Sequence, residues 1–161
     1  MAIKNNGVIN NPQRIICGVP VDIFSIMIAD KYDPSAIPGA WKKFWSEFPK
    51  SALPSGSTAY GVSIPIPNTQ GELHYVAGVE VSSDFVAPSG FELTTITAGN
   101  YLVLDHVGSI MDLAQSYAEA YGAIFPASGL EMREGAHLEI YDAMLDPMSD
   151  AYVMGIAIPV K

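Results

Sequence analysis

The segment 136–141, with the sequence AHLEIY, carries the residue best suited to binding chemistry, Glu139. Side chains two positions apart on a strand share a face, so His137, Glu139 and Tyr141 would lie together. We expect the two aliphatic residues between them to face helices, and Glu139 to face a cavity or water. In a cavity, where screening is weak, this carboxylate would attract a cationic or hydrogen-bonding ligand. The alternative is a solvated strand glutamate without a binding role.

Aromatic residues at helical spacing could form the walls of such a site. Trp41 and Trp45 are one helical turn apart, and Tyr117 and Tyr121 have the same spacing. The faces of such rings attract cations and stack on planar molecules. The aromatic residues predicted to contact a ligand are Trp41, Trp45, Tyr60 and Tyr121. Tyr117 is expected in the core, and ordinary core packing is the alternative for all of them.

Other kinds of active centre find little support in the sequence. His74, His106 and His137 are far apart and show no paired metal-ligand spacing, which predicts no metal site. Cys17 is the single cysteine, and a small buried hydrophobic residue is its simplest interpretation. The sequence contains no glycine-rich phosphate loop, nucleophile elbow or Cys/His pair. We therefore expect no cofactor, and we expect Asp30–Asp33 to form a solvated loop.

The negative charge of the chain lies entirely in its second half. Residues 81–161 contain eleven acidic and two basic side chains, whereas residues 1–80 contain six of each, which gives a net charge of −9. A protein that binds nucleic acid needs Lys and Arg opposite the phosphates, so we expect no direct nucleic-acid binding. The charge favours a cationic ligand or a basic protein partner, and simple solubility is the alternative.

Targeting and membrane segments are not evident. No apolar run approaches the ~20 residues needed to cross a bilayer. The start of the sequence, Met1–Gly7, has no apolar stretch of signal-peptide length. These features predict a soluble, cytoplasmic protein that does not associate with a membrane, and they leave its oligomeric state open.

An internal repeat organises the chain. Phe48–Leu53 reappears as Phe125–Leu130, and Tyr75–Val81 reappears as Tyr152–Ile158, both at an offset of 77 residues. Two matches at one offset indicate a duplicated structural unit. The repeat therefore predicts a fold with pseudo-two-fold symmetry.

Each half shows the same order of strand, helix, strand and strand. We predict one domain, 1–161, whose halves span approximately 14–84 and 91–161. Apolar spacing predicts the following elements. The strands are Arg14–Phe24, Thr58–Ile64, Leu73–Val81, Phe91–His106 (interrupted at Ala98–Asn100), Ala136–Ala143 and Ala151–Val160, and the helices are Ile37–Phe48 and Ser109–Phe125. Helices packed on an antiparallel sheet give the α+β class.

Five motifs then point to a known family. In order, they are Leu73–Val81, Ile96–Val103 with a central "ala-gly-x-tyr", His106–Ser109 with "his-x-gly", Leu138–Tyr141 with "glu-x-tyr", and Ile158–Lys161. From about residue 14 to its end, the chain resembles the GyrI-like small-molecule-binding domain. This effector-binding domain also forms the drug-sensing part of some bacterial transcription activators.

The resemblance implies two strand–helix–strand–strand units that face each other across a central pocket. It also implies that aromatic residues line this pocket and that Glu139, as the glutamate of "glu-x-tyr", lies within it. Activator relatives carry a DNA-binding region ahead of the domain, whereas only about 13 residues precede it here. We therefore expect a stand-alone member of the family without direct transcriptional control.

Three functions are compatible with these features. The leading hypothesis is a stand-alone binding protein for a small hydrophobic molecule, cationic or planar, with Glu139 as its polar anchor. The second is a hydrolase that opens strained electrophilic rings, such as cyclopropanes, with Glu139 protonating the ring or activating water. The third is an inhibitor of a DNA topoisomerase, in which the acidic half of the chain contacts a basic surface.

Overall fold

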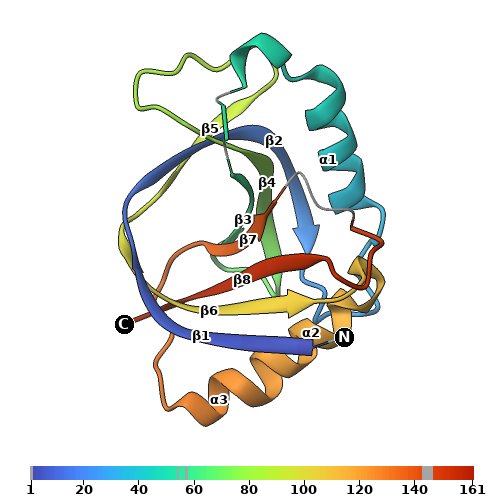
Figure 1. Cartoon of the computed structure of the whole chain (residues 1–161), viewed down its shortest axis with the longest axis vertical. Coiled ribbons are helices and arrows are strands. Elements are labelled where there is room, and N and C mark those ends of the chain that lie inside the picture. The colour runs from blue at the N-terminus through green and yellow to red at the C-terminus, as the bar shows by residue number, and fades with distance from the viewer. Residues whose placement is uncertain (1, 54, 57, 143–146) are drawn as a thin grey trace.

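The computed structural model of the chain describes residues 2–53, 55–56, 58–142 and 147–161. Eight strands form one sheet in the order β1-β6-β8-β7-β3-β4-β2-β5, and neighbouring strands are antiparallel throughout. The predicted α+β class is thereby confirmed (Figure 1).

The elements agree closely with those predicted from apolar spacing. The first half contains β1 (Ala2–Asn11), β2 (Arg14–Phe24), α1 (Ala36–Glu47), η1 (Lys50–Ala52), β3 (Ala59–Pro65) and β4 (Glu72–Val81). The second contains β5 (Glu92–Ile96), β6 (Gly99–Val107), η2 (Ile110–Asp112), α2 (Leu113–Glu119), η3 (Ala120–Ile124), α3 (Phe125–Ser128), β7 (His137–Tyr141) and β8 (Val153–Val160). Ala143, the last residue of one predicted strand, lies outside the described residues.

The two halves are related by pseudo-two-fold symmetry, as the repeat predicts. β3 of the first half pairs with β7 of the second at the centre of the sheet. β4 and β2 follow on one side of this pair, and β8 and β6 follow on the other. Each half is therefore a strand–helix–strand–strand unit, and the central pairing joins both into one sheet.

The outermost strands are exchanged between the halves. β1 precedes β2 in the chain but pairs with β6, and β5 precedes β6 but pairs with β2. β1 was not predicted, because Ala2–Asn11 is rich in asparagine and mostly exposed, and so lacks the apolar alternation of the other strands.

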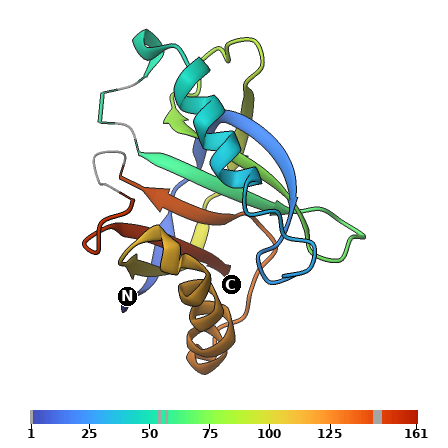
Figure 2. The ribbon, with the colours of Figure 1, turned by 90° about the vertical axis from the view of Figure 1, so that its right-hand side faces the viewer.

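Both helices cover the same face of the sheet. Figure 2 shows α1 above and α2 below the central strands, on the side nearest the viewer. On the opposite, helix-free face, Ile96 of β5, Tyr101 of β6 and Ala157 of β8 belong to one buried cluster. Since β5 and β6 lie near opposite ends of the strand order, the sheet must curl around this cluster.

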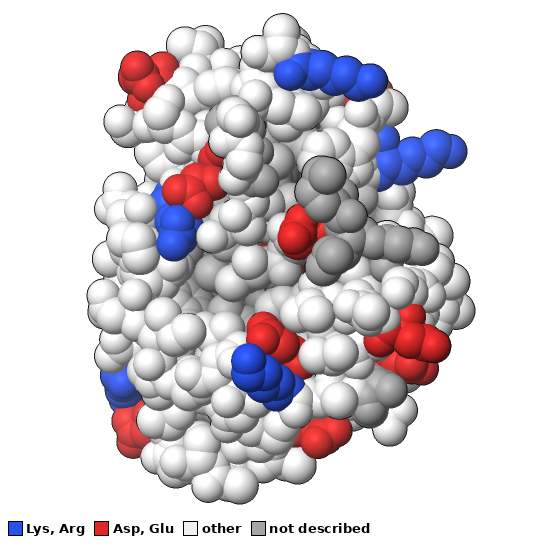
Figure 3. Space-filling model, in the orientation of Figure 1, with Lys and Arg blue, Asp and Glu red and all other residues white. Residues whose placement is uncertain are grey.

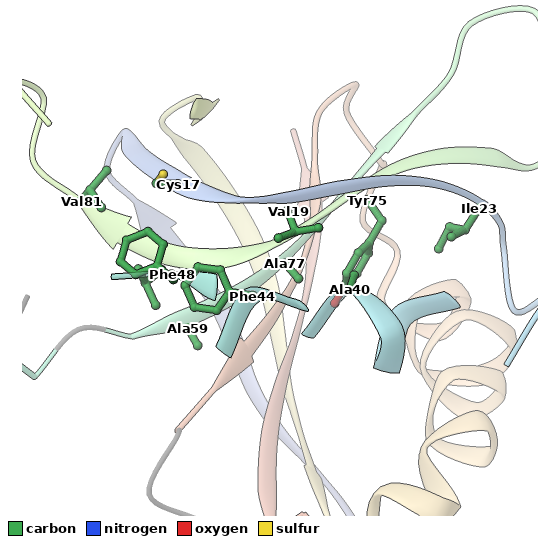
Figure 4. Packing of buried hydrophobic residues seen from close by; sticks show 11 residues of the cluster. Cys17, Val19, Ile23, Ala40, Phe44, Phe48, Ala59, Tyr75, Ala77 and Val81 are labelled. Carbon is green, nitrogen blue, oxygen red and sulfur yellow. The ribbon is translucent and has the colours of Figure 1, made fainter. Parts of the chain in front are cut away.

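Each helix packs on its own half of the sheet. In Figure 4, Phe44 of α1 and Phe48, which directly follows this helix, point toward strands β2 and β4, where they pack with Val19 and Ala77. Ala120, at the end of α2, belongs to a matching cluster with residues of β6 and β8. Between the two helical clusters, neither helix packs closely along the central strands β3 and β7, which long side chains from the helices reach instead.

A buried histidine anchors the start of the second helix, and this helix contains a π-turn. His106 is fully buried, its Nδ1 lies 2.6 Å from the Ser116 hydroxyl, and its Nε2 lies 3.0 Å from the carbonyl oxygens of Gly108 and Ser109. These bonds tie the end of β6 to α2. The single predicted helix is observed as consecutive 3₁₀, α, π and α segments, and π-turns are frequent at functional sites.

Charged side chains are dispersed over the surface that Figure 3 presents. They form small separate groups among uncharged atoms, and several acidic groups lie directly beside basic ones. Within the described residues, no helix has the length and apolar character needed to span a membrane.

Candidate functional site

A cavity of about 930 Å³ lies between the helix-bearing face of the sheet and the two helices. This volume falls within the range of small-molecule pockets. Most of its lining residues are apolar or aromatic. They include Trp41 and Trp45 from α1, Tyr117 and Tyr121 from the second helix, His137, Glu139 and Tyr141 from β7, and Tyr32 from the loop after β2. Residues from both halves of the repeat thus enclose one space.

Glu139 is a buried carboxylate held by tyrosine hydroxyls. It is only 6% exposed. Tyr117 donates to Oε1 at 2.8 Å, Tyr75 donates to Oε2 at 2.9 Å, and Tyr141 also donates to Oε2. Among the described residues, no Lys, Arg or His forms a salt bridge with this carboxylate. The cavity therefore contains an acid whose partners are neutral.

The position of Glu139 depends on a glycine in the neighbouring strand. Gly61 of β3 is the register partner of Glu139 on β7. A Cβ atom at Gly61 would lie 2.3 Å from the Tyr75 hydroxyl oxygen and 2.6 Å from Glu139 Oε2. Both distances are too short for non-bonded atoms, so the absent side chain provides the space in which this tyrosine and this carboxylate meet.

The network continues from Tyr75 to the tryptophans. The indole Nε1 of Trp41 donates to the Tyr75 hydroxyl at 3.0 Å. The Trp41 ring meets Tyr141 edge-on at a centroid distance of 5.1 Å and stacks on Trp45 at 6.2 Å. Trp45 is 42% exposed, so the aromatic wall extends from the buried acid toward solvent.

Burial keeps the hydroxyl groups around Glu139 protonated. The pKa values of Tyr75, Tyr117 and Tyr141 are raised well above the usual range, first by burial and then by the negative charge of Glu139. They remain hydrogen-bond donors at any physiological pH. The tyrosines therefore act as hydrogen-bond donors to the Glu139 carboxyl group.

Comparisons with known proteins identify the family of this chain. The family model of the GyrI-like small-molecule-binding domain matches residues 25–161. The chain belongs to the GyrI-like family. The transcriptional regulator BrlR of Pseudomonas aeruginosa is 36% identical to this GyrI-like chain over 101 residues, which are 59% of the chain and 37% of the regulator. The chain thus spans little more than a third of that regulator's length.

Solved structures share the fold over the whole GyrI-like chain. SAV2435 bound to tetraphenylphosphonium is 20% identical, with a TM-score of 0.73, over all of this chain and 94% of the other. An integron cassette protein from Vibrio cholerae is 17% identical, with a TM-score of 0.70, over the full length of both chains. At these identities the likeness concerns the fold.

Four of the five predicted site residues line the cavity of this GyrI-like domain, and one does not. Trp41, Trp45, Tyr121 and Glu139 come together there. Tyr60 lies on the helix-free face, is 5% exposed and packs in the cluster within the curled sheet, beneath the Arg14 guanidinium. The reason is strand alternation: because Gly61 faces Glu139, its neighbour must project to the opposite side.

The aliphatic side chains of β7 face the side of the sheet opposite to the one that we predicted. His137, Glu139 and Tyr141 share a face as predicted. However, Leu138 and Ile140 pack in the cluster within the curled sheet and not against the helices. Both helices lie on the same side as Glu139, which is why the cavity forms between them.

Several site residues were not identified from the sequence. Tyr117 was expected in the core, although its spacing from Tyr121 placed both on one helix face. Tyr75 donates to Glu139 from a different strand, which no local pattern reveals. Tyr32, expected in a solvated loop, lines the cavity from the eleven-residue connection between β2 and α1.

The described residues contain no group of three or more His, Cys, Asp and Glu side chains that could hold a metal ion. The lone thiol of Cys17 is buried in the cluster beneath α1, where burial raises its pKa to about 11. The chemistry available at the cavity is therefore that of the buried Glu139 and the exposed Asp142 carboxyl groups, tyrosine hydroxyls, aromatic faces and one imidazole.

Proposed function

We propose that this GyrI-like chain binds a small hydrophobic molecule, above all a planar or delocalised cation, in the cavity between the helices. Glu139 would be the electrostatic anchor, and Trp41, Trp45 and Tyr121 would form the walls. The observation that carries the proposal is the buried carboxylate, which has three hydroxyl donors and no cationic partner among the described residues. A buried charge attracts a counter-ion strongly because water does not screen it.

The hydrogen bonds at Glu139 favour one class of cation over another. An ionised carboxylate offers about four acceptor positions. Three of them receive tyrosine hydroxyls, which leaves little room for the several N–H donors of an ammonium or guanidinium group. A delocalised cation needs no hydrogen bonds and gains from the aromatic faces around it. That the related SAV2435 has been solved with tetraphenylphosphonium supports this choice of probe.

The test compares two ligands of nearly the same shape and opposite charge, tetraphenylphosphonium and tetraphenylborate. Both tryptophans of the chain line the cavity, so selectively excited tryptophan fluorescence reports on this site. We expect the phosphonium to bind at least about tenfold more tightly than the borate, because a carboxylate several ångströms away is worth more than ~1 kcal/mol in a poorly screened site. In Glu139→Gln the preference for the cation should fall, because the exposed Asp142 is then the acidic side chain left among the described lining residues.

The matched control is Glu119→Gln, which removes the same charge at an exposed position of α2. This variant should keep the preference for the phosphonium. Equal affinities for both ions in the wild-type protein, or an unchanged preference in Glu139→Gln, would contradict the proposal. Mass spectrometry of ligands recovered after incubation separates binding from turnover, and a hydrolysed product would support the hydrolase instead.

A further inference from the structure

The cavity holds a second polar side chain, His137, two residues before Glu139 on β7. Because side chains at positions i and i+2 lie about 7 Å apart along one face of a strand, the two groups stand side by side. Tyr121 stacks against the imidazole, with ring centroids 5.8 Å apart and planes 28° from parallel. The carboxylate and the imidazole thus lie on one strand of the cavity wall.

His137 is neutral in the physiological range. Burial, assisted by the positive charge of Arg133, lowers its pKa to about 4. A neutral imidazole has one nitrogen that donates a hydrogen bond and one that accepts. Its effect on a ligand therefore depends on which nitrogen carries the proton.

The Tyr121 hydroxyl fixes that choice. The hydroxyl oxygen of Tyr121 lies 2.6 Å from Nδ1 of His137. Within the described residues, this nitrogen is the one hydrogen-bond partner of the hydroxyl. Burial raises the pKa of Tyr121, so the hydroxyl keeps its proton. Nδ1 is the acceptor that the described residues offer this hydroxyl, and we assign the hydrogen bond as O–H to Nδ1. With the hydroxyl proton directed to Nδ1, the imidazole proton lies on Nε2.

Nε2 of His137 is available to a ligand. It has no hydrogen-bond partner within the described part of the chain. Among the described residues, two side-chain polar atoms are both fully buried and without a hydrogen-bond partner, the Tyr101 hydroxyl and Nε of Arg133. Nε2 of His137 is not one of them, so this unpartnered atom is accessible. The side chain lines the cavity, which therefore presents an N–H donor beside the anionic Glu139.

We infer that the site selects cations that also carry a hydrogen-bond acceptor, such as a carbonyl or ether oxygen, about 7 Å from the positive centre. Glu139 attracts the charge, and Nε2–H of His137 donates to the acceptor. This inference rests on the proposed binding function and adds to it a specificity-determining residue. A purely hydrocarbon cation would satisfy only half of the site.

The experiment compares tetraphenylphosphonium with its (4-acetylphenyl)triphenylphosphonium analogue, which places a carbonyl at the far end of one ring. We expect the acetyl analogue to bind about three- to tenfold more tightly to the wild-type protein, the range of one hydrogen bond. In His137→Phe, which keeps an aromatic ring beside Tyr121, the ratio of the two Kd values should fall to about one. His137→Gln, which keeps an N–H donor, should restore a preference for the acetyl analogue.

The outcomes separate the two proposals. If neither phosphonium binds, the proposed function fails and the inference fails with it. If both bind equally to the wild-type protein, or if His137→Phe keeps the preference, the binding function stands and the role of His137 is refuted. Independently of any variant's folding, ¹⁵N NMR of the wild-type imidazoles should show a His137 ring protonated at Nε2 at pH 7, and protonation at Nδ1 would overturn the inference.

Discussion

Replacing Gly61 by alanine tests whether this glycine provides the space for the Tyr75–Glu139 pair. The added methyl carbon would lie 2.3 Å from the tyrosine oxygen and 2.6 Å from the carboxylate oxygen. Because Gly61 lies in β3 at a negative φ, alanine is compatible with its backbone. The substitution therefore probes the contact and not the conformation of the strand.

The expected effect is large for the addition of one methyl group. Overpacking in a core costs about 1–3 kcal/mol, and losing a hydrogen bond to a charged group costs about 1.5–3 kcal/mol. Alanine offsets about 0.4–1 kcal/mol of this by restricting the unfolded chain. Since both costs arise from one displacement and overlap, we expect the free energy of unfolding to fall by about 2–4 kcal/mol.

Equilibrium unfolding in urea, followed by circular dichroism, measures this change. Gly39→Ala is the matched control, because nothing lies within 4 Å of its added Cβ and the residue is exposed on α1. That variant should gain up to about 1 kcal/mol, as alanine replaces glycine in a helix. The reasoning is refuted if Gly61→Ala is as stable as the wild-type protein.

A double substitution locates the clash. In a Tyr75→Phe background, the hydroxyl that would lie closest to the new methyl group is absent. Gly61→Ala should then destabilise the protein by less than it does in the wild type, with an interaction energy of about 1 kcal/mol or more. Equal losses in both backgrounds would show that the tyrosine hydroxyl is not what the methyl group displaces.

Two further predictions concern groups around this network and on the other face of the sheet. The pKa of His74 is raised above 6.5 by hydrogen bonds to Asp22 and then Glu92. Its contribution to stability is therefore present below pH 6.5 and is lost as pH rises through the folded-state pKa. In urea unfolding, His74→Gln should destabilise the protein more at pH 6 than at pH 9. A destabilisation that grows toward pH 9 would contradict this prediction. Trp41→Phe removes the indole donor to Tyr75 and should cost about 1 kcal/mol of unfolding free energy, whereas no loss would show that this bond does not order the site.

The sequence predicted the elements well because their signals are local. Alternating or continuous apolar residues gave β2 as Arg14–Phe24, and spacings of three and four gave α1 to within one residue. β1 escaped detection because it is an edge strand that buries few side chains, so selection for apolar alternation is weak there. Its position depends on pairing with β6, a strand almost ninety residues away.

The lining of the cavity was predicted in part. Glu139 and the aromatic pair on α1 were found because strand and helix periodicities place such residues on a face. Tyr60 was misplaced because periodicity does not tell which face borders the cavity. Only the register of β3 against β7, which sets Gly61 opposite Glu139, decides that Tyr60 points away.

By itself, the sequence determined the duplication, the order of elements in each half and the presence of a carboxylate on an alternating strand near aromatic residues. These properties depend on residues close together in the chain or on a fixed repeat offset. The tertiary structure decided which residues meet. Tyr75, Tyr117 and Tyr141 reach Glu139 from two strands and a helix. This convergence follows from the pairing of the two halves through β3 and β7. The two helices pack on separate halves of the sheet, and the cavity lies between them over these central strands.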